Sequence, residues 1–171
     1  MTDNNGIVNF IWRIANLLRG PYTSDRYKDV ILPMVVLRRF DCVLEPTKEA
    51  VLDQAEKADI EALLCRASGH TFANKSRFTF EALLNDPDNI KSNFTEYLNG
   101  FTSNVRDIIE NFEFDKELKK LDDKNLLYLI VKEFTAADLH PDKVSNRMMG
   151  YIFEELIRRF SENAEAGDHY I

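Results

Sequence analysis

The segment from residue 25 to about residue 44 constrains the fold more than any other part of this sequence. Its middle, from Val30 to Leu37, consists of apolar residues and one proline, Pro33. As a helix, this segment is apolar on every side, and such a helix is stable only when several neighbours cover it. Pro33 removes one backbone donor and predicts a kink unless the helix starts close before it. We therefore expect a central, buried helix over residues 25–44.

The remaining patterns predict more helices and no sheet. Apolar residues recur every three or four positions over residues 7–18 and, most regularly, over 145–161. Shorter segments with the same period cover residues 46–65, 79–84, 90–98, 103–112, 115–121 and 124–137. No stretch alternates with a period of two for long enough to require a strand. The predicted fold is all-α, a single compact bundle of about seven to eight helices, in which residues 69–76 form the longest loop and the best candidate for mobility.

The length and composition indicate one globular domain. A chain of 171 residues buries roughly 70% of its unfolded surface, which is enough for one core. We expect the helical domain to span residues 1–161 and the polar residues 162–171 to begin a linker. The longest apolar run is far shorter than the roughly 20 residues that span a bilayer, so no membrane segment is predicted. The N-terminus has no positively charged leader, and we expect a cytoplasmic protein whose Cys42 and Cys65 are reduced.

Contact with nucleic acid would have to come from a local basic patch, because the formal net charge is −7. The candidate residues for contact with DNA or a protein partner are Arg13, Arg19, Tyr22, Arg26, Lys28, Arg38 and Arg39. The first five surround the connection between the first two predicted helices. The alternative to a contact surface there is a charged helix end whose tyrosine lies in the core. Arg38 and Arg39 lie on the apolar helix, where ion pairs with Asp41 or Glu45 are the alternative. An exposed Trp12 would indicate a partner surface.

Patterns that carry catalytic chemistry are missing. The six glycines are scattered singly and no Gly-x-Gly occurs, so no phosphate or dinucleotide loop is predicted. Cys42 and Cys65 have no near partner, and the histidines are isolated at positions 70, 140 and 169, so no zinc spacing is present. Glu154 and Glu155 are better explained as partners of Arg158 and Arg159 than as an acid and base pair. We predict no catalytic, cofactor-binding or metal-binding residue.

Two long stretches, Ile11 to Val51 and Lys143 to Ile171, closely resemble the N-terminal region of the modification (M) subunits of type I restriction-modification DNA methyltransferases. In that family a helical N-terminal domain precedes a domain that uses S-adenosylmethionine to methylate adenine N6. The resemblance implies that residues 162–171 lead toward such a catalytic domain. The family's glycine-rich cofactor loop and Asn-Pro-Pro motif match no position here, so this chain is expected to be inactive alone.

The resemblance also implies a role for the domain. It would help two M subunits close around DNA together with the specificity (S) subunit, and a restriction (R) subunit could join them. S-adenosylmethionine is implied for the full-length subunit only, and no cofactor for this chain. The alternative from a different class is a stand-alone helical adaptor that binds proteins and has no role on DNA.

Overall fold

The computed structural model describes residues 4–169, and its regular elements within that range are all helices, which confirms the all-α prediction. Ten α-helices lie within these residues: α1 (Asn4–Leu18), α2 (Tyr27–Leu44), α3 (Lys48–Lys57), α4 (Glu61–Ser68), α5 (Phe80–Leu83), α6 (Ile90–Asn99), α7 (Ser103–Asn111), α8 (Phe114–Asp123), α9 (Leu127–Ala136) and α10 (Asn146–His169). Short 3-10 turns occupy Ser24–Arg26, Glu45–Thr47 and Pro87–Asn89. No helix of the described region has the length and hydropathy that a bilayer crossing requires.

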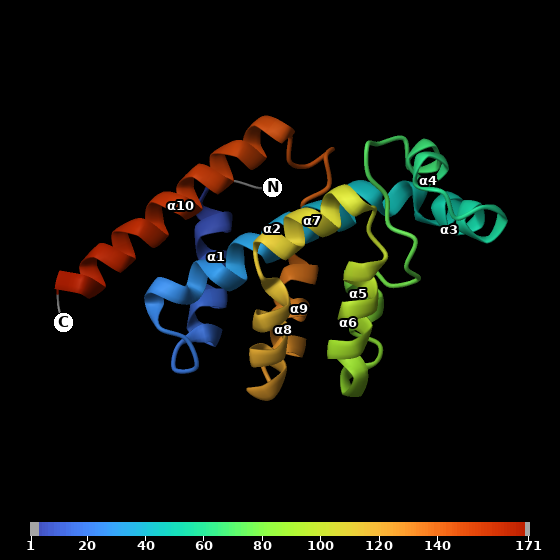
Figure 1. Cartoon of the computed structure of the whole chain (residues 1–171). Coiled ribbons are helices and arrows are strands. Elements are labelled where there is room, and N and C mark those ends of the chain that lie inside the picture. Colours follow the sequence, from blue (N-terminus) through green and yellow to red (C-terminus); the bar gives the residue numbers. More distant parts are fainter. Residues whose placement is uncertain (1–3, 170–171) are drawn as a thin grey trace.

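The central element of the bundle is α2, as the sequence predicts. It contacts α1, α8, α9 and α10, and runs through the middle of the molecule in Figure 1. Val30, Ile31 and Met34 are fully buried, and the helix continues through Pro33. Because covering helices meet α2 from several directions, its all-round apolar surface is removed from water.

The longest helix, α10, crosses one end of the bundle beside α1 (Figure 1). Its apolar side is buried at Met149, Ile152, Leu156 and Phe160, and it also contacts the turn at Ser24–Arg26. The backbone remains helical to His169, past residue 162, where the sequence predicted that a linker begins. The domain boundary at that position stays a prediction.

The predicted helix over residues 46–65 is two helices in the structure. Ala58 and Ile60 are extended, with φ of −159° and −123°, and they separate α3 from α4. The break allows α4 to fold back on α3, where Val51 and Leu64 form a small cluster with Ala73. The periodic pattern of small residues does not reveal this break, because the residues on each side of it keep the helical spacing.

The loop predicted over residues 69–76 is present and extends to residue 79, but hydrogen bonds anchor it to the end of α6. Ala73, Asn74 and Ser76 are buried. The Asn74 side chain donates to the Tyr97 carbonyl (3.0 Å), and the Lys75 amide donates to the Gly100 carbonyl (2.9 Å). Mobility was expected because these residues lack a helical period. The lack of a period says nothing about hydrogen bonds with distant residues.

Candidate nucleic-acid and partner interface

The connection between α1 and α2 carries exposed basic side chains, as predicted. Gly20, at a φ of 100°, turns the chain there, and Arg19, Arg26 and Lys28 are exposed. Arg26 pairs with Asp29 on the same helix end (3.3 Å). Within the described region, Arg19 and Lys28 have no ion-pair partner. These two cations are therefore the ones most available to an anionic ligand.

Tyr22 does not belong to the exposed surface. It is buried in the main core, and the Lys120 ammonium of α8 lies 4.0 Å from its ring centroid. Burial raises the pKa of Tyr22 well above its usual value, and the negative charges of Glu117 and Asp29 add to this effect. The ring thus supports the helix connection and is not placed for stacking on a base.

Helix α8 adds basic groups that the sequence analysis missed. Lys120 lies over Tyr22, and Lys116 pairs with Glu113 (3.3 Å). Both lysines and Arg26 act electrostatically on Glu117, whose pKa is nevertheless raised, mainly by burial. The lysines of this helix alternate with acidic residues along the sequence, so they do not stand out as a basic cluster. Only the fold brings them close to the α1–α2 connection.

Arg13 lies elsewhere, on the exposed side of α1. Its guanidinium pairs with Glu133 of α9 (3.4 Å) and stands over the Phe10 ring (5.8 Å). The pair is solvent-exposed, so it contributes little to stability. Arg13 therefore contacts α9. Among the described contacts, none joins it to Arg19, Arg26 or Lys28.

Arg38 is a buried structural residue. Its guanidinium donates to the carbonyl oxygens of Ala137 and Thr135 (3.0 Å each) and to the Asp41 carboxylate (2.9 Å). The two carbonyls lie at the end of α9 and just after it. Arg38 therefore ties α2 to the end of α9 and does not face a phosphate.

Arg39 is equally buried and holds the loop between α9 and α10. It donates to the carbonyl oxygens of Leu139 and Val144 (2.7 Å each) and to the Asn146 side chain (2.9 Å). Burial lowers the pKa of Arg39. Arg38 thus forms the ion pair with Asp41 that was its structural alternative, whereas Arg39 is held by two backbone carbonyls and an amide oxygen instead of a carboxylate. Because both guanidinium groups are buried, we remove both arginines from the set of DNA-facing candidates.

A cavity of about 700 Å³ lies between α1, α10 and the loop that follows α9. Apolar residues of all three segments line it, among them Phe10, Leu139 and Ile152, with charged side chains of both signs alongside. The wall joins residues from the two stretches, Ile11–Val51 and Lys143–Ile171, that carry the family resemblance. The two stretches also contact each other directly where α10 packs on α2.

These features define a helical domain with a buried arginine framework and a small exposed basic region. Residues 7–134, about three quarters of the chain, match the family model described as the HsdM N-terminal domain. The chain therefore belongs to this family, the N-terminal domains of the M subunits of type I restriction-modification systems. Comparison with curated proteins and with solved structures gave no match.

Proposed function

We propose that this domain helps to assemble a type I methyltransferase and to clamp it on DNA, without catalysing methyl transfer itself. The membership of residues 7–134 in the HsdM N-terminal domain family carries the proposal. The S subunit and a second M subunit are the protein partners, and an R subunit can join the complex. Adenine N6 methylation and S-adenosylmethionine belong to the full-length subunit.

The basic residues at the α1–α2 connection support the role on DNA. Arg19 and Lys28 are exposed and have no ion-pair partner among the side chains that the structure describes, and Arg26 lies between them in the chain. A protein of net charge −7 gains affinity for phosphate only where cations are locally in excess. In this proposal the α1–α2 connection contacts the DNA backbone, and the reading of bases is left to the S subunit.

Exposed apolar side chains support the role in assembly. Trp12 on α1 is 43% exposed, and Tyr151 and Ile157 on α10 are more than half exposed. Tryptophan and tyrosine are enriched at the energetic centres of protein interfaces. We assign these residues to contacts with the S subunit or the second M subunit.

The test is DNA binding by the assembled complex of M and S subunits as a function of salt. The variant Arg19→Glu/Lys28→Glu is compared with Lys57→Glu/Lys91→Glu, which makes the same charge change at exposed lysines of α3 and α6. If two phosphate contacts are lost, the slope of log K against log salt decreases by about 2 in magnitude, and only in the first variant. Equal affinities and slopes in both variants would favour the adaptor alternative.

A further inference from the structure

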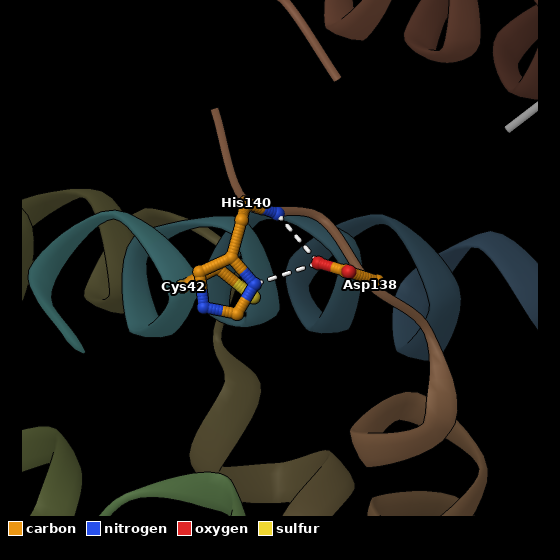
Figure 2. A group of neighbouring side chains, drawn as sticks. All are labelled: Cys42, Asp138 and His140. Atoms are coloured by element: carbon orange, nitrogen blue, oxygen red, sulfur yellow. Dashed lines mark hydrogen bonds and ion pairs between the residues drawn. The ribbon is translucent and has the colours of Figure 1, made fainter. Parts of the chain in front are cut away.

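Cys42, Asp138 and His140 come together at the place where α2 meets the loop after α9. Cys42 belongs to the last turn of α2, and the other two residues lie on the loop almost one hundred positions later. Figure 2 shows the three side chains converging. Each residue offers one ligand atom: Cys42 its sulfur, Asp138 a carboxylate oxygen and His140 a ring nitrogen. These three atoms lie within 4.8 Å of one another.

The three ligands and Glu45 come from two short-range pairs of residues. Cys42 and Glu45 are three positions apart on the end of α2, so they share one face of that helix. Asp138 and His140 are two positions apart on the loop. The Nδ1 atom of His140 lies 2.6 Å from Asp138 Oδ1, and its Nε2 atom lies 2.8 Å from Glu45 Oε2. In this structure both ring nitrogens are therefore held by hydrogen bonds with carboxylates, and a metal ion at Nδ1 would replace the hydrogen bond with Asp138.

We propose that these residues form a binding site for a divalent transition-metal ion, zinc by preference. Cys42 Sγ, Asp138 and His140 Nδ1 are the ligands, and Glu45 accepts the hydrogen bond of the Nε2–H group. Mixed sulfur, nitrogen and oxygen donors suit zinc, which takes four ligands in a tetrahedral arrangement. A histidine ligand that donates its other N–H to a carboxylate is the usual arrangement around such ions.

The burial of Cys42 and the exposure of the other two ligands fit this role. Cys42 is fully buried at the base of the site, whereas Asp138 and His140 are partly exposed and leave access for an ion and for water as the fourth ligand. Burial raises the pKa of the Cys42 thiol, although Arg38 and a hydrogen bond with the Leu139 backbone oppose this. A bound metal ion overcomes that cost because it deprotonates a coordinating thiol.

The ion would act as a structural brace. Arg39 already holds the loop after α9 through the carbonyls of Leu139 and Val144. A metal ion bound to Cys42 and to Asp138 and His140 would add a second tie between the same loop and α2. Binding to the folded state alone would raise its stability in proportion to the logarithm of metal concentration.

The test is titration of the reduced, chelator-treated chain with Co²⁺, followed by competition with Zn²⁺. We expect a thiolate-to-cobalt charge-transfer absorption and tetrahedral d–d bands, which Zn²⁺ abolishes. Cys42→Ser removes the charge-transfer absorption, whereas Cys65→Ser, at the other cysteine, keeps it. Asp138→Asn and His140→Gln weaken Co²⁺ binding by more than tenfold, and His70→Gln leaves it unchanged.

Glu45→Gln separates positioning from ligation. It should retain the charge-transfer absorption and weaken binding by about tenfold, the usual effect of losing the carboxylate that orients a histidine ligand. Asp138→Asn changes a partly exposed side chain, so it tests the site even if Cys42→Ser does not fold. The proposal is overturned if the chain shows no such absorption, if Cys65→Ser loses it, or if Asp138→Asn and His140→Gln bind Co²⁺ as tightly as the unaltered chain.

Discussion

Asp41 is the buried carboxylate on which several elements depend. It accepts hydrogen bonds from Arg38 of α2, from the Tyr97 hydroxyl of α6 (3.1 Å) and from the Phe80 amide at the start of α5. Burial raises its pKa, while the charge of Arg38 and these hydrogen bonds act in the opposite direction. Removing one partner of such a pair leaves the other charge buried and uncompensated.

We therefore expect Asp41→Asn to lower the free energy of unfolding by about 3 kcal/mol, because Arg38 loses its ion-pair partner. Urea unfolding followed by circular dichroism measures the change. The control is Asp59→Asn, which breaks the exposed pair with Lys75 and should change stability by less than about 1 kcal/mol. Equal effects of the two substitutions would contradict the role assigned to Asp41.

Lys48 is a second polar residue held in a low-dielectric environment. Its ammonium donates to Asn74 and lies 5.9 Å from the centroid of the Tyr97 ring. Burial lowers its pKa from 10.5 to about 8, although the charges of Asp41 and Glu49 act against that change. The folded state therefore releases this proton at a lower pH than the unfolded state does.

The sign of the pH effect follows from that difference. Between about pH 8 and pH 10.5 the unfolded chain binds more protons at Lys48, so this residue adds stability as the pH rises. We expect the free energy of unfolding of the unaltered chain to gain about 2 kcal/mol relative to Lys48→Met between pH 7.5 and pH 10. Urea unfolding of both proteins at the two pH values checks this, and the comparison cancels the titration of tyrosines. A constant difference would contradict it.

At the scale of elements, Arg39 clamps the loop between α9 and α10 onto α2. Lysine has one compact ammonium group and cannot reproduce the three hydrogen bonds of this planar guanidinium. We expect Arg39→Lys to accelerate exchange of the Lys143 and Val144 amides, which donate to the His140 carbonyl, by about tenfold or more. Hydrogen exchange by NMR measures this. The exposed Arg66→Lys on α4 is the control, and unaltered exchange in Arg39→Lys would show that the clamp does not hold the loop.

The packing of the loop before α5 against the end of α6 depends on Gly100. A Cβ atom at this position would lie 2.6 Å from Ser76 Cβ and 2.8 Å from the Ser76 amide nitrogen. We expect Gly100→Ala to destabilise the protein by about 1–3 kcal/mol, since the loop must move. Gly150 in α10 has open space around it, and Gly150→Ala should be neutral or stabilising by up to about 1 kcal/mol. Thermal unfolding of both variants distinguishes these results, and equal melting temperatures would contradict the expectation.

At the scale of the whole molecule, we expect this chain not to bind S-adenosylmethionine. It has no Gly-x-Gly, and residues 4–169 contain no strand from which a cofactor loop could extend. Isothermal titration should give no binding heat with this chain and a saturable curve with the full-length subunit. Stoichiometric uptake by the chain alone would overturn the non-catalytic role proposed above.

Local patterns predicted most of the fold. The central helix, the regular apolar side of α10 and the connection at Gly20 all follow from residues a few positions apart. The break between α3 and α4 was missed, because extended residues at 58 and 60 leave the spacing of apolar residues on either side intact. All the basic residues of the predicted set were candidates for DNA or partner contact, and only the structure shows which of them are exposed and which are buried.

The amino-acid sequence by itself determined the helical class, the buried α2 and the family. Helix periodicity, composition and long matching stretches are all properties of neighbouring residues. Only the tertiary structure decided that Arg38 and Arg39 bind carbonyl oxygens about one hundred residues away and that Cys42 faces His140. Burial, pairing and ligand geometry depend on which distant segments pack together, and local spacing carries no information about that choice.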